Sequence, residues 1–252
     1  MATRGTAVFL GVMLLLLGLA GLGGLALRHH PDLFAGGPAL VQPPDTGESF
    51  ARVYQWEYGG RSWEIRLDIP RSTYDHFKGL ERPSRIVLGE NGPIWRYAYE
   101  DLVTNPQDDA SIDAIAKELQ RLGRSRGWSD DRILSFTLAF VQSLPYTSDS
   151  VTAGYDEYPR YPIETLVDNG GDCEDTSILY ASLILAMGYG AALVSPPGHM
   201  AVGVLADKSV PGRGYEHKGQ WYLYAETTGH GYNIGDMPTQ YRNQRADLYP
   251  LG

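Results

Sequence analysis

The hydrophobic pattern of the chain begins with an uninterrupted apolar run at residues 7–27. The run contains no charged residue over 21 positions, and a helix of that length covers roughly 30 Å, the thickness of the hydrocarbon layer of a membrane. A cleaved signal peptide usually has an apolar stretch of about 7–15 residues and a small-residue cleavage site, whereas this run ends in "LALRHH". The pattern favours an uncleaved transmembrane anchor over a removed signal peptide.

The residues that flank this run bear on its orientation. Arg4 lies in the N-terminal flank, residues 1–6, and Arg28 directly follows the run. The positive-inside bias is therefore slight, and it leans toward a C-terminal domain outside the cytoplasm of a single-pass membrane protein. Residues 28–50 are rich in proline and glycine and have no apolar period, so we expect them to form a tether.

Alternating hydrophobic and polar positions follow in residues 51–100, which we expect to form a β-rich N-terminal module. In "VYQWEYGGRSWEIRLDIP" a Gly-Gly pair separates two alternating runs, which predicts a β-hairpin. The pairs expected across it are Tyr58 with Arg61, Trp56 with Trp63 and Tyr54 with Ile65. The resulting aromatic face is either a ligand platform or a strand face packed on the core, and the second interpretation is favoured.

Helical spacing marks the part of the chain that we assign to a second domain, residues 101–252. It predicts helices at residues 111–122 and 129–144, the second capped by Ser129 and stopped by Pro145. Between them and the next helix lies the irregular segment "YTSDSVTAGYDEYPRYP", and irregular segments of that length inside compact domains are often functional.

A third helix, wholly apolar in its interior, is predicted from Cys173 to near Gly188. Two strands, residues 199–206 and 220–226, follow it and are joined by a polar loop at residues 207–219. Helices followed by strands that neighbour one another in the sequence predict an α+β fold with an antiparallel sheet.

Composition and charge exclude some functions. The chain has 252 residues, of which 11% are aromatic, and a net charge of −9. An acidic chain without a basic stripe is not suited to nucleic acid, so no nucleic-acid partner is expected. One cysteine permits no intramolecular disulfide, and one cysteine with scattered histidines does not provide the four ligands of a structural zinc site.

The single cysteine stands at a helix start. Asp172 is a good N-cap, and Asp175 occupies the position of a capping-box carboxylate. The thiol of Cys173 then lies near the positive end of the helix dipole. That effect lowers a thiol pKa by less than about one unit, and the neighbouring acids oppose it. The helix alone does not make Cys173 a nucleophile.

A histidine and an acid elsewhere in the sequence could activate the thiol, which the helix alone does not do. Of the six histidines, His199 and His230 are the candidates, both after a glycine. If the two strands pair so that Ala206 faces Gln220, then His199 lies beside Glu226, within a residue or two. A carboxylate next to an imidazole fixes its tautomer, which completes a nucleophile, a base and an orienting acid. Asp236 is the alternative for the acid.

The chain here resembles a known family, the transglutaminase-like cysteine enzymes, which share a papain-type core. "GGDCEDTSILYASLILAMG" is similar to their cysteine helix, "GHMAVGV" to their histidine strand, "WYLYAETT" to their acid strand and "FVQSLPYTSD" to a segment upstream of the cysteine. The resemblance covers residues 111–238 and extends to the bacterial and archaeal cysteine peptidases of the superfamily. It departs from the family at the acid, which is more often Asp or Asn, and in the short interval between cysteine and histidine.

The resemblance implies a fold and an activity. The implied fold is α+β, with the nucleophile helix packed on an antiparallel sheet and the N-terminal hairpin module beside it. Cys173 is the implied nucleophile, His199 its base and Glu226 the third member. The implied activity is hydrolysis or acyl transfer on protein or peptide amides through a Cys173 thioester, with water slightly favoured over an amine. A catalytically silent binding module is the alternative.

Two further roles stay open at this point. The family includes members that carry the same "DCED" run and use calcium, so Asp172 and Glu174, with loop oxygens such as those of Asp149 or Asp156, either hold a calcium ion or serve as capping groups; no cofactor is required. The amide of Cys173 is the first candidate for an oxyanion donor. Gln142 or Tyr146 could supply the second donor.

Overall fold

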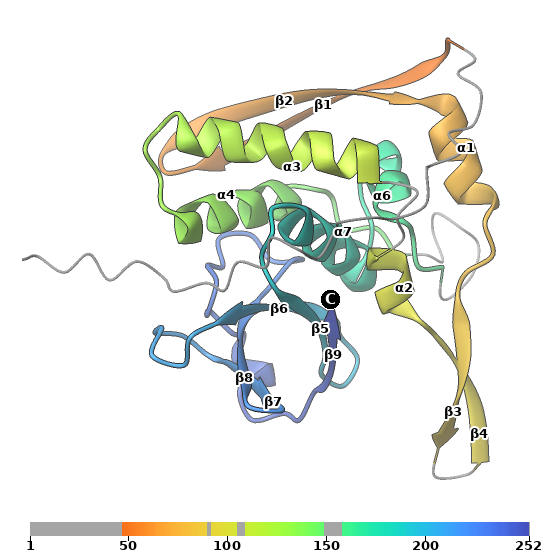
Figure 1. The fold of residues 1–252 in the computed structure, drawn as a ribbon, viewed down its shortest axis with the longest axis vertical. Coiled ribbons are helices and arrows are strands. Elements are labelled where there is room, and N and C mark those ends of the chain that lie inside the picture. Colours follow the sequence, from red (N-terminus) through yellow and green to blue (C-terminus); the bar gives the residue numbers. More distant parts are fainter. Residues whose placement is uncertain (1–46, 90–91, 105–108, 149–157, 252) are drawn as a thin grey trace, which may run out of the picture.

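The computed structural model describes residues 47–89, 92–104, 109–148 and 158–251 (Figure 1). Its first elements are the predicted hairpin strands, β1 (Ser49–Tyr58) and β2 (Arg61–Pro70). All three predicted cross-strand pairs are confirmed, from Tyr58 with Arg61 to Tyr54 with Ile65. Gly59 and Gly60 both have positive φ, at 61° and 72°, the conformation of a two-residue type I′ turn.

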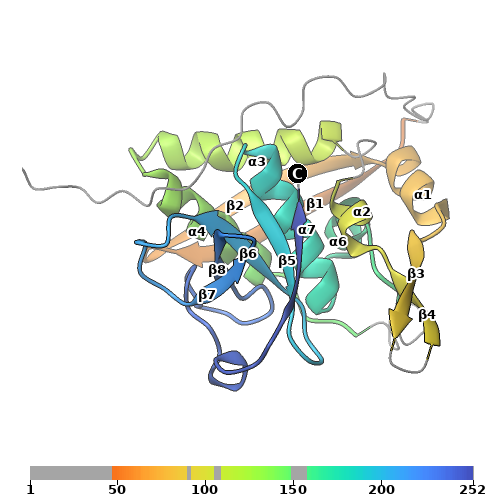
Figure 2. The same cartoon turned by 60° about the horizontal axis from the view of Figure 1, so that its bottom comes forward.

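The rest of the N-terminal region contains both helices and strands. Its elements are α1 (Arg71–Gly79), β3 (Ser84–Gly89), β4 (Gly92–Tyr97) and α2 (Tyr99–Val103). Strands β3 and β4 form a separate two-stranded sheet, which projects from the body of the molecule (Figure 2). The two short helices were not anticipated from the sequence.

In the part of the chain that the structure describes, four helices form the middle of the molecule. They are α3 (Asp109–Arg124), α4 (Asp130–Gln142), α6 (Pro162–Asp168) and α7 (Cys173–Ala186). The helices predicted at residues 111–122, 129–144 and from Cys173 are therefore confirmed. Helix α7 is buried along nearly its whole length, and it lies between the other helices and a sheet (Figure 1). A helix that is apolar on all sides needs this central position.

The sheet on the other side of α7 has five antiparallel strands in the order β7-β8-β6-β5-β9. The strands are β5 (Ala191–Ser195), β6 (Ala201–Ala206), β7 (Gly214–His217), β8 (Gln220–Ala225) and β9 (Asp247–Leu251), with a short 3-10 turn at Thr239–Tyr241. Two predictions need correction. Ala206 pairs with Trp221 rather than Gln220, and the loop predicted at residues 207–219 contains strand β7.

One hydrophobic core joins these layers. It runs without a break from Trp56 and Trp63 of the hairpin through Phe136 of α4 to α7 and the sheet. The rings of Trp63 and Phe136 lie 4.9 Å apart, edge to face. The aromatic face of the hairpin therefore packs on the core, as predicted, and the N-terminal hairpin shares a core with the helices of the second region.

The predicted membrane anchor at residues 7–27 and most of the predicted tether lie outside the described residues. Within the described ranges no helix is long and apolar enough to cross a membrane.

Candidate active site

The N-terminus of α7 carries the cysteine as the sequence predicts. Asp172 is the N-cap, its carboxylate accepts from the backbone N–H of Asp175 at 3.5 Å, and the Asp175 carboxylate accepts from the N–H of Asp172 at 3.3 Å. The reciprocal pair satisfies two donors that a helix start leaves without partners. Cys173 is the first helical residue.

Two glycines precede this turn for a steric reason. A Cβ added to Gly171 would lie 2.5 Å from Cβ of Asp175, and one added to Gly170 would lie 2.6 Å from the carbonyl oxygen of Pro145. The segment after α4 also bonds to this turn, since the N–H of Thr147 donates to the carbonyl of Gly171 at 2.9 Å. Only residues without a side chain allow the capping carboxylate and this segment to approach so closely.

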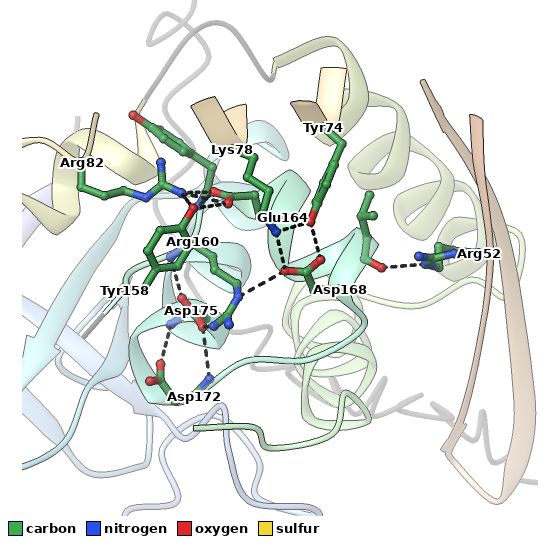
Figure 3. Close-up of polar contacts among 12 residues, drawn as sticks. Arg52, Tyr74, Lys78, Arg82, Tyr158, Arg160, Glu164, Asp168, Asp172 and Asp175 are labelled. Carbon is green, nitrogen blue, oxygen red and sulfur yellow. Dashed lines mark hydrogen bonds and ion pairs between the residues drawn. The ribbon is translucent and has the colours of Figure 1, made fainter. Parts of the chain in front are cut away.

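Asp175 has a second partner that the sequence did not reveal (Figure 3). The guanidinium of Arg160 forms an ion pair with Asp175, and the backbone N–H of Arg160 donates to Oδ1 of Asp175 at 2.7 Å. Both side chains are buried, and Nε of Arg160 lies 3.5 Å from Oδ2 of Asp168. Arg160 lies at the end of the irregular segment and thereby fastens that segment to the nucleophile helix.

The sulfur of Cys173 donates a hydrogen bond to Oε2 of Glu174 at 2.8 Å, and the backbone N–H of Met200 is close enough to influence its pKa. Burial raises the pKa of the Cys173 thiol well above its ordinary value, the Glu174 carboxylate raises it further, and the Met200 N–H opposes both. Cys173 therefore rests as a protonated thiol, and Glu174, whose role the sequence left open, accepts its proton in a hydrogen bond.

His199 and Glu226 are brought together as predicted. Nε2 of His199 lies 3.1 Å from both carboxylate oxygens of Glu226. The imidazole also stacks on the ring of Tyr241, with ring centroids 4.8 Å apart and an interplanar angle of 2°. The other ring nitrogen, Nδ1, makes no hydrogen bond within the described residues. The imidazole is thus held on one edge and on one face, with Nδ1 left for a reacting partner.

The surroundings of Glu226 keep it ionised. Burial alone would raise the pKa of Glu226, but the hydrogen bond and charge of His199, with hydrogen bonds from Thr228, lower it below the usual value. Thr228 donates to Oε1 through its backbone N–H at 3.1 Å and its hydroxyl at 2.7 Å, and the Tyr224 hydroxyl donates to Oε2 at 3.1 Å. The sequence did not identify these donors.

The three candidate residues meet where α7, β6 and β8 converge. The influence of the Met200 N–H on the Cys173 pKa indicates that the residue after His199 lies near the sulfur. One residue beyond Glu226, the hydroxyl of Thr227 lies 3.0 Å from that of Thr176 on α7. In the described part of the chain Cys173 and His199 do not bond to each other directly, and the thiol bonds to Glu174 instead.

The structure gives Gln142 a different place from the one expected of an oxyanion donor. Its amide nitrogen donates to the carbonyls of Glu226 at 2.8 Å and Tyr232 at 3.0 Å, and its oxygen accepts from the N–H of Gly231 at 3.2 Å. Both N–H donors are occupied, because α4 uses them to hold the loop after the acid strand. Gln142 is therefore a positioning residue.

The remaining candidate residues lie at the surface or in a turn. Tyr146 is 61% exposed and forms a bridge with Gly171 beside the cysteine turn. The Asp236 carboxylate accepts from the backbone and side chain of Asn233, both at 3.0 Å, and stabilises that turn. His230 is exposed, in the loop that Gln142 holds.

A calcium site is not defined by the described residues. Within them no group of three or more His, Cys, Asp or Glu side chains is placed to share a metal ion. Asp172 caps the helix, Glu174 accepts from the thiol, and the loop acids Asp149 and Asp156 lie outside the described residues. Calcium binds six to eight oxygens, so the carboxylates in place do not fit the ion by themselves.

Comparison with family models and curated proteins finds no match, and comparison with solved structures finds weak similarities. No family model matches it, and no curated protein matches it. Among solved structures, EGTA-treated LapG of Legionella pneumophila is 20% identical, with a TM-score of 0.36 over 56% of this chain and 78% of its own. Calcium-bound LapG is 19% identical, with a TM-score of 0.30 over 54% and 81% of the two chains.

A candidate protease of Parabacteroides distasonis is also similar, at 16% identity and a TM-score of 0.33, over 75% of this chain and 41% of its own. Similarities of this size do not define an activity.

Proposed function

We propose that the chain is a cysteine hydrolase or acyltransferase that acts on protein or peptide amide bonds. The observation that supports this most directly is the placement of Cys173 at a helix N-terminus, near the backbone N–H of the residue after His199, while Glu226 holds Nε2 of that histidine. A nucleophile, a base with one free nitrogen and a buried orienting acid are the elements of nucleophilic catalysis.

The first half-reaction forms a thioester. Nδ1 of His199 takes the thiol proton as Sγ of Cys173 attacks the carbonyl carbon, and Glu226 stabilises the imidazolium that results. The backbone N–H of Cys173, at the start of α7, stabilises the negative oxygen. As the C–N bond breaks, the imidazolium returns the proton to the leaving amine.

The second half-reaction releases the acyl group. An attacking water gives its proton to His199, the C–S bond breaks and the thiol is regenerated, with a carboxylic acid as the product. An amine in place of water would give transamidation by the same steps. We favour water slightly, because the sequence contains no dedicated amine-binding motif.

The resting thiol favours one competing function. A thiol that is buried, bonded to Glu174 and raised in pKa is what a catalytically silent binding module with this fold would contain. The hypothesis that the chain is an enzyme requires His199 to remove the thiol proton of Cys173 when substrate displaces the thiol from Glu174. The two functions therefore differ in whether Cys173 ever becomes acylated.

Acylation is the experiment that separates them. The full chain is incubated with a pooled peptide library, quenched in acid and examined by mass spectrometry for an acyl adduct on Cys173 and for new peptide termini. Adducts and cleavage are expected for the parent chain and absent for Cys173→Ala. Cleavage that persists in Cys173→Ala, or no adduct with any peptide, would contradict the proposal.

The membrane part of the proposal rests on the sequence alone. The uncharged run at residues 7–27 supports a single-pass anchor with the C-terminal domain outside the cytoplasm. The mature N-terminus is then expected at or next to Met1, with the protein in the membrane fraction. A mature N-terminus beyond Leu27 would show a removed signal peptide instead.

A further inference from the structure

A cavity of about 640 Å³ opens beside the hairpin and is not used by the chemistry described above. Its walls come from the end of β1 with its turn, from α4, and from the loop that follows β8. The lining residues that matter here are Gln55, Trp56, Glu57, Gln142, His230 and Tyr232. The volume falls within the range of about 300–1,000 Å³ that is usual for ligand sites.

The hairpin contributes an open strand edge to this cavity. Among the described strands β1 pairs only with β2, and the closing pair of a two-residue hairpin is a hydrogen-bonded one. Glu57 with Ser62 and Gln55 with Glu64 are then the alternate pairs, so the backbone N–H and C=O of Gln55 and Glu57 point away from β2. In the described part of the chain no backbone hydrogen bond from another element reaches them.

Trp56, between these two residues, adds a buried donor. Its side chain is 4% exposed and lines the cavity, and its indole N–H finds no acceptor among the described residues. A buried donor without an acceptor is destabilising, and natural structures contain few of them.

The opposite wall of the cavity is tied to the catalytic acid. Gln142 lines the cavity, and its amide nitrogen donates both to the carbonyl of Glu226 and to that of Tyr232, another lining residue. One buried side chain therefore positions the end of the acid strand and the cavity wall together. A molecule bound between β1 and this loop lies next to the element that carries Glu226.

We propose that this cavity, the β1 cleft, binds an extended segment of the protein substrate, which adds to β1 as a third strand. The proposal rests on the function proposed above and states how that substrate is held. An extended main chain presents the alternating C=O and N–H groups that the edge of Gln55 and Glu57 lacks. Because these bonds involve only the main chain, the cleft recognises an unfolded or extended conformation more than a particular sequence.

A pair of proline substitutions tests the edge without breaking the hairpin. Glu57→Pro removes an N–H that points into the cleft, and Ser62→Pro removes one that points away from it on the opposite edge. Neither N–H bonds across the hairpin, so both prolines are compatible with the strands. The two residues also bond to each other through their side chains, so each variant loses that same bond and Ser62→Pro is a matched control.

Binding is measured with the full chain carrying Cys173→Ala, exposed to a pooled library of random peptides that carry a benzophenone crosslinker. Cross-links are expected on residues 55–59 and 230–233. Their yield should fall about tenfold with Glu57→Pro, which loses a main-chain bond and adds a steric clash, and stay unchanged with Ser62→Pro. Equal losses in both variants, cross-links elsewhere or no cross-links at all would overturn the proposal.

Cleavage of the same library by chains that retain Cys173 separates this proposal from the function on which it rests. Cleavage that Glu57→Pro leaves unchanged would overturn the cleft and leave the enzyme function standing. Cross-linking at the β1 edge without cleavage by the parent chain would support the cleft and overturn the enzyme function.

Discussion

Asp175 and Glu226 are both buried carboxylates, and each has a nitrogen-bearing partner. Asp175 is paired with Arg160, a permanent cation that is itself buried. Glu226 is paired with His199, whose imidazole can gain and lose a proton. Asp175 also holds backbone groups of the cysteine turn, whereas the other donors to Glu226 fix the carboxylate itself.

One carboxylate is paired with an arginine and the other with a histidine, and this difference gives the two pairs different roles. An arginine is protonated at any pH at which the protein is folded, so the Arg160–Asp175 pair can only hold the turn in place. An imidazole, unlike a guanidinium, can act as a general base and then as a general acid, which is the role that the proposed mechanism gives to the His199–Glu226 pair. We therefore expect the first pair to affect folding stability and the second to affect reaction rate.

The largest expected effect is on the catalytic side. Glu226→Gln should lower the rate of peptide cleavage by orders of magnitude, up to about 10⁴-fold, because the imidazole loses the partner that sets its tautomer. The melting temperature should change little, since glutamine can still accept from Thr228. Single-turnover kinetics and a thermal melt measure the two. A rate within a few-fold of the parent would move the acid role away from Glu226.

The next effect should appear on the structural side. Asp175→Asn removes the closer and more deeply buried of the two carboxylates that face the charge of Arg160 and leaves only Asp168, so we expect a loss of about 3 kcal/mol in the free energy of unfolding. The double variant Arg160→Met/Asp175→Asn removes both charges and should recover most of that loss. Urea denaturation gives the stabilities, and the cleavage rate per folded molecule should stay within a few-fold. A double variant that folds well but is inactive would show that the pair also serves the chemistry.

Glu174 bonds to the cysteine itself, and replacing it should have a smaller effect than the Glu226 and Asp175 variants. Its carboxylate helps to raise the Cys173 pKa, so thiolate forms only as the pH rises above the usual thiol range. Glu174→Gln removes that charge, and the curve of alkylation rate against pH should move to lower pH, with roughly severalfold faster reaction at neutral pH. Iodoacetamide alkylation followed by mass spectrometry measures it. An unmoved curve would mean that burial alone sets the thiol pKa.

The smallest expected effect concerns calcium. If Asp172 only caps the helix and Glu174 only accepts from the thiol, thermal unfolding curves measured in millimolar calcium and in chelator should superimpose. Asp172→Asn should then cost about 1 kcal/mol or less, because asparagine also caps well. A melting temperature that rises with calcium concentration would show instead that these acids complete an ion site, because an ion that binds only the native state stabilises it by mass action.

Much of the local structure could be predicted from the sequence. The Gly-Gly turn determined the register of the hairpin because a two-residue loop leaves one pairing. The run "DCED" predicted the capping box because its two partners, Asp172 and Asp175, lie within one helical turn. The order of cysteine helix, histidine strand and acid strand also placed His199 beside Glu226, although the pairing of the two strands was displaced by one residue.

What the tertiary structure decided were the contacts between parts of the chain that are distant in sequence. Arg160 reaches Asp175 from a segment without periodicity, and Gln142 holds the acid loop from 84 residues away, so no local pattern could signal either. The Glu174–thiol bond joins residues that are neighbours in the sequence, yet the sequence did not reveal that the Glu174 carboxylate accepts from the sulfur. Short-range rules determine turns and caps because few conformations compete there, whereas partners across the core are chosen by packing, which only the folded chain defines.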